Sequence, residues 1–229
     1  MYYDRHVHYD KVLMDIEVQR DFFCLGGSCF KPEAAQAARN VRRLFAWARR
    51  REVPVMSTVL RVRRDRIGPM APVEHLIEGT DGEKRLHGTI LNRCIDFGLR
   101  NVTDPPEDLF ETYQQVIFEK RFTDIFEHAR AERLLTELRA DTFVVCGAGS
   151  ATGVVEAVVG LRARGFGVIL ASDAILDLDH PKAEMAWLRM IAKGAVPMST
   201  KDIVSAPRAE RSRQRILRDA LRGSHTLAR

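Results

Sequence analysis

The segment from Thr142 to Gly165 constrains the fold more than any other part of this chain. It opens with an uninterrupted apolar run, residues 142–146, whose β-branched and aromatic side chains suit a strand buried on both faces. A glycine-rich turn over 147–152 and an apolar stripe over 154–161 follow, and Gly165 is placed to end a helix. A buried strand, a tight turn and an amphipathic helix in this order are typical of a parallel sheet.

Gly153 falls in the first turn of the expected helix. Unpaired backbone amides and the helix dipole favour an anion at such a position. Ser150 or Thr152 is expected to cap the helix start with its hydroxyl group. Because ligands of parallel α/β sheets bind at the carboxyl ends of strands, we expect a site at this turn.

Strand-like and helix-like patterns alternate along the rest of the chain. The expected strands are 11–16, 53–60, 115–119, 142–146, 168–172 and 195–198. The expected helices include one that opens at Pro32 and buries Ala34, Ala38, Val41, Leu44, Phe45 and Ala48, one that ends over 134–140, and one over 183–192. This alternation predicts an α/β fold, with a parallel sheet between two layers of helices. Glu17, Lys120 and the turn all follow strand ends, so we expect them to converge.

Length and composition predict one large domain. At 229 residues with 45% hydrophobic content, the chain can bury a full α/β core. No stretch approaches the roughly 18 apolar residues of a membrane span, and the first ten residues lack the apolar core of a signal peptide. We therefore expect no membrane association and a cytoplasmic location. The four cysteines lack CxxC spacing, which favours reduced thiols over disulfides or a zinc site.

The positive charge is concentrated near the carboxyl terminus. Residues 205–229 hold seven arginines against two acidic residues, 7 − 2 = +5, which equals the formal charge of the whole chain. An apolar stripe at positions 216, 217, 220 and 221 predicts a helix that docks on the body or on a sister subunit. Nucleic-acid binding is disfavoured because the tail has no aromatic residue for stacking. We therefore divide the chain into a domain over 1–204 and a basic helical tail over 205–229.

Four segments together resemble a known family. They are KVLMDIEVQRDFF, IEGTDG after His75, VIFEKRFTDIF and VVCGAGSATGVVEAV. Their order and spacing are similar to those of the isochorismatase-like (cysteine hydrolase) superfamily, which includes nicotinamidases and N-carbamoylsarcosine amidohydrolases. The resemblance covers residues 10–204. It implies a three-layer α/β/α, Rossmann-like fold with a six-stranded parallel sheet, a small-molecule substrate and a homo-oligomer.

The resemblance also implies a set of site residues. The amidases of this family use an Asp, a Lys and a Cys: the Cys attacks a carbonyl, the Asp takes its proton, the Lys polarises the pair, and turn amides hold the oxyanion. Lys120 matches the Lys, and Glu17 falls at the Asp position. If the alignment of the first segment with the family pattern is shifted by two residues, Asp15 takes that role. Glu17 is preferred, because with Glu17 at the Asp position the residues after it also match the family pattern. The turn residues expected to bind the substrate are Ala148, Gly149 and Ser150.

The position of the family's nucleophile is occupied by Gly153. A residue without a side chain cannot form a thioester. Cys146 lies before the turn and is expected to be a buried structural thiol. Nothing in the sequence places Cys24 or Cys29 at the site.

Two functions fit this pattern. In the first, the chain resembles the isochorismatase branch, whose members also carry Gly at this position and cleave a vinyl ether. That reaction needs a proton delivered to carbon and a water molecule, with Glu17 as the acid, so we expect hydrolysis of a small carboxylate-bearing metabolite without a thioester step. In the second, catalysis has been lost and the chain is a ligand-binding or scaffolding relative.

The sequence disfavours a metal at the site. Nicotinamidase-like members place an Asp-x-His pair after the second strand, whereas residues 57–63 supply neither a carboxylate nor an imidazole. The arginines that stand there would face an anionic substrate or form a solvated basic loop: Arg61, Arg63 and Arg64. His6 and His8 are close enough in sequence to share a metal, but no third ligand is in view.

A dinucleotide cofactor is also disfavoured. Gly147, Gly149 and Gly153 resemble a dinucleotide fingerprint, and Asp173 ends the next strand as a ribose-binding acid would. However, that motif normally opens its domain, and an NAD(P)-binding oxidoreductase would leave the other three segments unexplained. We expect no cofactor.

Overall fold

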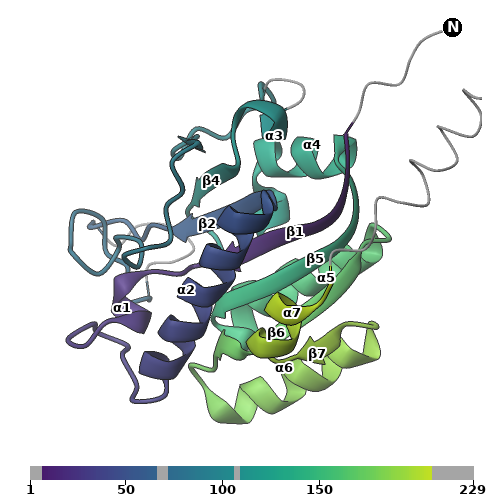
Figure 1. Cartoon of the computed structure of the whole chain (residues 1–229). Coiled ribbons are helices and arrows are strands. Elements are labelled where there is room, and N and C mark those ends of the chain that lie inside the picture. Colours follow the sequence, from purple (N-terminus) through teal and green to yellow (C-terminus); the bar gives the residue numbers. More distant parts are fainter. Residues whose placement is uncertain (1–6, 66–71, 106–108, 208–229) are drawn as a thin grey trace, which may run out of the picture.

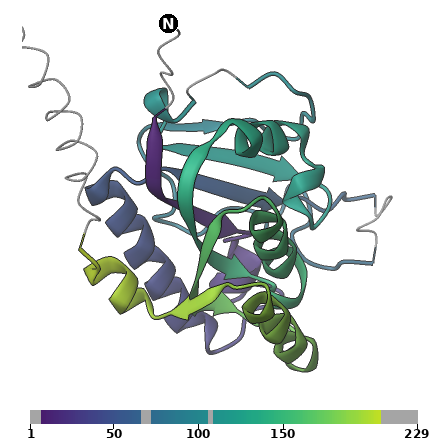
Figure 2. The same cartoon turned by 90° about the vertical axis from the view of Figure 1, so that its right-hand side faces the viewer.

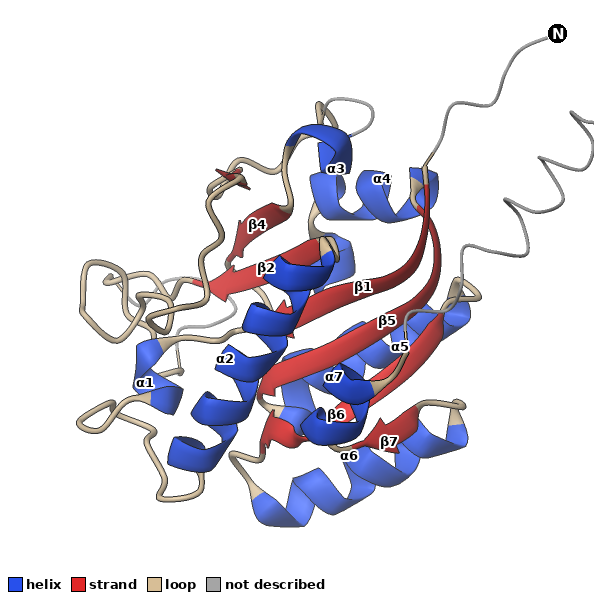
Figure 3. Cartoon of the chain, in the orientation of Figure 1, coloured by secondary structure: helices blue, strands red, loops and turns tan. Residues whose placement is uncertain are grey.

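A computed structural model describes residues 7–65, 72–105 and 109–207 of the chain. Its strands are β1 (His8–Ile16), β2 (Val55–Leu60), β3 (Cys94–Asp96), β4 (Gln115–Lys120), β5 (Arg139–Ala148), β6 (Gly167–Leu176) and β7 (Val196–Met198). They form one sheet in the order β3-β4-β2-β1-β5-β6-β7, and every neighbouring pair is parallel. Figure 3 shows these strands in red, with helices on both sides. The predicted parallel α/β fold is therefore confirmed.

Helices cover both faces of the sheet. They are α1 (Arg20–Phe23), α2 (Ala34–Arg51), α3 (Leu109–Thr112), α4 (Ala129–Glu137), α5 (Val155–Ala163), α6 (His180–Ala192) and α7 (Thr200–Ser205), with short turns of helix at η1 (Ile125–Glu127) and η2 (Ser150–Val154). Residues of α1, α2 and α7 share a buried cluster with Leu13 of β1, whereas α3 to α6 share one with Val12 and Met14. Figures 1 and 2 show the two layers from perpendicular directions. Alternate side chains of β1 thus enter different layers, as strand geometry requires.

The longest helix follows its sequence pattern closely. All six residues of the predicted apolar face of α2 are buried: Ala34, Ala38, Val41, Leu44, Phe45 and Ala48. The helix ends at a left-handed residue, Glu52, with φ 53°. Arg49, Arg50 and Arg51 occupy its last turn, where positive charge interacts favourably with the helix dipole.

Two details of the predicted architecture are wrong. The sheet has seven strands instead of six, because the three-residue strand β3 pairs with β4. So short a strand carries no periodic pattern, and its position depends on tertiary contacts such as the bond from the Leu91 amide to Gln115 Oε1, 2.7 Å. The helix expected to continue to Ala140 ends at Glu137, and β5 begins at Arg139 because it pairs with His8 of β1.

None of the helices in the described ranges combines the length and apolar character that a bilayer-spanning segment needs. The end of the expected tail, from residue 208, lies outside the described residues. Its docking therefore stays a prediction.

Candidate active site

The predicted site residues lie at the carboxyl ends of three strands. Glu17 follows β1, Lys120 is the last residue of β4, and residues 149–153 form the turn after β5. Strands β1 and β5 are neighbours, and the connection after β1 runs to β2 while the connection after β5 runs to β6, toward opposite halves of the sheet. In open α/β sheets, this switch in strand order is where a ligand crevice forms.

Glu17 and Lys120 form a buried ion pair. Lys120 Nζ lies 2.6 Å from Glu17 Oε1, and the side chains of Lys120 and Glu17 are only 0% and 3% exposed. The same ammonium donates to the carbonyl oxygens of Phe122, 2.8 Å, and Thr123, 2.7 Å. All three protons of the ammonium group therefore have acceptors. The pair is held in place by the segment that follows β4.

The backbone of Glu17 turns sharply as it leaves β1. Its φ of 52° lies in the left-handed region, which costs a residue with a side chain roughly 1–2 kcal/mol. The amide of Glu17 donates to Thr58 Oγ1 of β2 at 3.1 Å, and its carbonyl accepts from the Gln19 amide at 2.7 Å. These bonds offset part of the cost of the conformation, while Lys120 holds the carboxylate beside Gly153 in the turn after β5.

The carboxylate of Glu17 occupies the space beside Gly153. A Cβ atom added to Gly153 would lie 2.9 Å from Glu17 Oε1 and 3.0 Å from Ile16 Cγ2. Separations this short require the neighbouring group to move, and Glu17 is pinned by Lys120. The side chain of Glu17 therefore fits in this position because residue 153 has no side chain.

The turn from β5 to α5 closes without the predicted cap. Neither Ser150 nor Thr152 caps the helix start with its side chain. Thr152 instead donates its hydroxyl and its amide to the carbonyl of Gly149, at 3.2 and 3.0 Å, because Gly149 adopts a left-handed φ of 76°. The hydroxyl of Ser150 is buried and has no partner among the described residues. Ala148, at the end of β5, is fully buried.

A second carboxyl group, that of Glu156, lies near the pair. Glu156 is one helical turn beyond Gly153, and its Oε2 atom is buried with no partner in the described part of the chain. Burial raises its pKa above the usual range, while a hydrogen bond with the Thr123 side chain and the charge of Lys120 lower it. The sequence prediction missed this residue. The available signal was a single carboxylate, three positions after Gly153, on a helix whose only other charged residue is Arg162.

Asp15, the alternative acid, belongs to a different ion pair. Its carboxylate accepts from Arg85 Nη2 at 2.8 Å and from the hydroxyl of Ser57. Burial raises the pKa of Asp15, although Arg85 acts in the opposite direction. Glu17, and not Asp15, is thus the acid that meets Lys120.

The arginines after β2 are paired and do not form a free anion-binding surface. Arg61 binds the carboxylates of Glu83 and Glu119. Arg63 pairs with Asp65, and the guanidinium of Arg64 donates to a backbone carbonyl. Because Arg61 already has two carboxylate partners, the structure does not support the interpretation in which it faces an anionic substrate.

Gln19 and Asp21 clamp a loop beside the site. Gln19 Nε2 donates to the carbonyls of Leu60, 2.8 Å, and Glu83, 2.7 Å, and its Oε1 accepts from the Leu60 amide. Asp21 Oδ2 accepts from the Leu76 amide at 2.6 Å. Side chains of the first matching segment therefore bind the two residues that flank the second, Leu76 and Glu83.

The structure also bears on two roles that the sequence disfavoured, Cys146 as a nucleophile and Asp173 as a ribose-binding acid. Cys146 is fully buried in β5, and burial raises the pKa of its thiol well above the usual range. A thiol in that state is a poor nucleophile. The carboxylate of Asp173 accepts from the amide and the hydroxyl of Thr200, both at 2.7 Å, so it is occupied and does not resemble an acid free to bind a ribose.

We expect the protein to lose stability as the pH falls from about 7.5 to about 5.5. His128, between η1 and α4, is buried against Phe118, and burial together with Arg130 lowers its pKa below 6.5. The unfolded chain therefore binds a proton before the folded chain does, and stability falls as the pH drops below the unfolded pKa. His75 contributes with the same sign, because burial lowers its pKa too.

Urea denaturation at both pH values measures this effect. His128→Phe should reduce the loss of stability, whereas substitution of the exposed His180 by Gln should leave it unchanged. An equal loss in the His128→Phe variant would show that His128 does not carry the pH dependence.

Comparison with known proteins yields one family. The family model described as the isochorismatase domain matches residues 11–202. None of the curated proteins matches the chain.

Several solved structures resemble this one. A nicotinamidase/pyrazinamidase from Bacillus subtilis is 19% identical and superimposes with a TM-score of 0.66, over 83% of this chain and 100% of its own. An N-carbamoylsarcosine amidase from Thermoplasma acidophilum is 18% identical, with a TM-score of 0.63 over 83% and 96%. An isochorismatase family protein from Desulfovibrio vulgaris subsp. vulgaris str. Hildenborough is 19% identical, with a TM-score of 0.64 over 86% and 97%. At these identities the likeness shows the fold alone.

Proposed function

This chain belongs to the isochorismatase family, and from that premise we propose that it hydrolyses a small carboxylate-bearing metabolite without a covalent thioester step. The observation that carries the proposal is the position of the Glu17 carboxylate. It is bonded to Lys120 and stands 2.9 Å from where a side chain of residue 153 would begin. A proton-transfer group therefore occupies the place that, by the family resemblance, belongs to a nucleophile.

The pair can move a proton without a covalent intermediate. In the reacting form Glu17 carries a proton, which it donates to a substrate carbon, as vinyl ether cleavage requires. This leaves the carboxylate that the structure shows, stabilised by Lys120 at 2.6 Å. Water then attacks the resulting cation and returns one proton to Glu17, which leaves a hemiketal. The bond from the hemiketal carbon to the leaving oxygen breaks as the hydroxyl proton of the hemiketal passes to that oxygen, so a carbonyl compound and an alcohol are released. Each turnover begins and ends with the same number of protons on the pair, so no thiol is needed.

In this proposal, backbone amides and hydroxyl groups of the turn after β5 bind the carboxylate of the substrate. The arginines near the site are paired, as described above, whereas residues 149–153 form a turn at the amino-terminal end of α5. The dipole of a helix favours negative charge at that end. The hydroxyl of Ser150, which has no partner within the described ranges, supplies a further hydrogen-bond donor.

A substrate screen tests the proposal. Carboxylate-bearing vinyl ethers, primary amides and carbamoyl compounds are incubated with the protein, and products are followed by mass spectrometry. We expect turnover of a vinyl ether that resists thiol alkylation and falls at least about 100-fold in Glu17→Gln. Replacement of the exposed Glu111 of α3 by Gln should leave the rate unchanged. Full activity in Glu17→Gln would show that Glu17 does not transfer the proton.

A ligand-binding or scaffolding role is the second candidate function. It is favoured by the burial of the ion pair, whose side chains are 0% and 3% exposed, and by the three acceptors around the ammonium group. For such a protein, the same screen gives no turnover, while a compound of the panel still raises the melting temperature.

Other properties stay proposals: the homo-oligomer is implied by the family resemblance, whereas the tail and the location rest on the charge and hydrophobicity of the sequence. We propose a domain over 1–204 with a basic tail over 205–229, a homo-oligomer and a cytoplasmic location. Helix α6 exposes Met185, Leu188 and Ile191, and the edge strand β7 exposes Val196. These apolar side chains suit a contact between subunits.

A further inference from the structure

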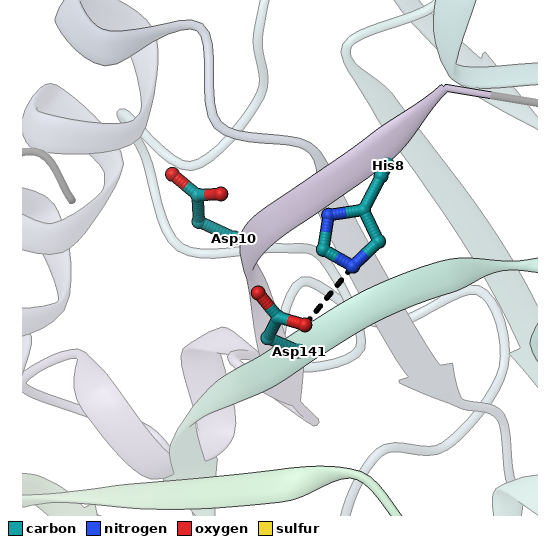
Figure 4. A group of neighbouring side chains, drawn as sticks. All are labelled: His8, Asp10 and Asp141. Carbon is teal, nitrogen blue, oxygen red and sulfur yellow. Dashed lines mark ion pairs between the residues drawn. The ribbon is translucent and has the colours of Figure 1, made fainter. Parts of the chain in front are cut away.

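Three potential metal ligands meet at the amino-terminal edge of the sheet. His8 and Asp10 lie at the start of β1, and Asp141 lies near the start of β5. Figure 4 shows the imidazole of His8 directed toward Asp141, where His8 Nε2 and Asp141 Oδ1 are 2.9 Å apart. One ligand atom from each of the three residues lies within 4.8 Å of the other two.

The strand register brings two negative charges together at this point. Tyr9 pairs with Ala140 and Lys11 with Thr142, which places Asp10 opposite Asp141 on the neighbouring strand. Like charges opposite each other destabilise a sheet. The His8 imidazole, when it is protonated, compensates only one of these two charges, that of Asp141. A bound cation would neutralise the carboxylates over a wider pH range.

The spacing of the ligand atoms suits a small divalent ion. With metal–ligand distances of 2.0–2.2 Å, two neighbouring ligands of a tetrahedral zinc ion lie about 3.3 Å apart. The His8 Nε2 to Asp141 Oδ1 distance of 2.9 Å is already close to that value. Asp10 is half-buried and His8 and Asp141 are exposed, so side-chain rotation can bring the third donor into place.

We propose that His8, Asp10 and Asp141 bind a divalent transition metal ion, for which zinc fits the imidazole and carboxylate donor set. The ion would join the starts of the adjacent strands β1 and β5, which are distant in sequence. His8 and Asp10 also line a surface hollow with Trp47 and Arg51, which leaves room for water at the remaining coordination positions.

The site is separate from the candidate active site. Strand β1 runs from His8 to Ile16, so the two sites lie at opposite ends of one strand, roughly 26 Å apart at 3.3 Å per residue. The role inferred for the ion is structural. Its test therefore does not depend on whether the protein is an enzyme.

Calorimetric titration of the chelator-treated full chain with zinc chloride tests the proposal. We expect one ion per chain. A hundredfold excess over the dissociation constant should raise the melting temperature by roughly 5–11 °C. His8→Ala and Asp141→Asn should each weaken binding at least about tenfold, because each removes one of three protein ligands. Without zinc, both variants should melt close to the parent chain.

Controls separate this site from other zinc ligands. His180→Ala removes an exposed histidine that lies 3.9 Å from the single carboxylate of Glu33, and it should not change the affinity. A variant in which Cys24 and Cys29 are both replaced by serine excludes binding by those thiols. Unchanged affinity in both His8→Ala and Asp141→Asn, or loss of binding in the variant without Cys24 and Cys29, would overturn the proposal.

Discussion

Replacing Lys120 by methionine is expected to lower the free energy of unfolding by about 3–5 kcal/mol. The substitution keeps most of the side-chain volume but removes the charge that faces Glu17, whose side chain is 3% exposed. A carboxylate left without a partner in the interior carries a large desolvation penalty, and the carbonyls of Phe122 and Thr123 lose a donor as well. Activity, if the proposed hydrolysis occurs, should be lost too.

A double-mutant cycle separates the ion pair from simple packing. Chemical denaturation is measured for Lys120→Met, for Glu17→Gln and for the double variant. Because the double variant leaves no unpaired charge, it should be more stable than Lys120→Met. Arg93→Met, which removes one partner of an exposed pair with Glu52, should change stability by less than about 1 kcal/mol. Additive effects of the two buried substitutions would show that the charges do not interact.

Introducing a cysteine at position 153 is expected to destabilise the protein unless Glu17 is replaced at the same time by the shorter Asp. In Gly153→Cys the new Cβ would meet Glu17 Oε1 at 2.9 Å and Ile16 Cγ2 at 3.0 Å. Overpacking of this kind costs about 1–3 kcal/mol. Glu17→Asp withdraws the carboxylate by one methylene, so the double variant should recover stability.

The double variant should also gain a reactive thiol. Its new sulfur would lie in the first turn of a helix and beside the shortened carboxylate at position 17, where a thiol is activated as a nucleophile. Alkylation located by peptide mass spectrometry distinguishes this thiol from Cys24 and Cys29, and Glu17→Asp alone serves as the control. If Gly153→Cys is as stable as the parent chain, Glu17 does not fill the space beside residue 153.

Local sequence patterns were sufficient for the architecture. The apolar run 142–146, the glycine turn and the alternating segments predicted a parallel α/β sheet, because burial on one or two faces imposes periods that can be read along the chain. The resemblance of four segments indicated the isochorismatase-like superfamily, and the isochorismatase domain model matches residues 11–202. The prediction failed where the pattern was too short, as for β3, or where two elements competed, as at residues 138–140.

The site was only partly accessible from the sequence. Glu17 and Lys120 were predicted to converge, and they lie in contact. Glu156 and the pairing of Arg61 with Glu83 and Glu119 were not predicted. Charged residues have no periodicity of their own, so which of them pair depends on register, side-chain length and the loops between strands.

The sequence by itself determined the fold class, the family and the absence of a side chain at Gly153. Only the tertiary structure decided that Glu17 fills that space and that Asp141 lies beside His8. The physical reason is distance along the chain. Burial patterns are local properties of a segment, whereas contacts between residues more than a hundred positions apart exist only once the strands have aligned.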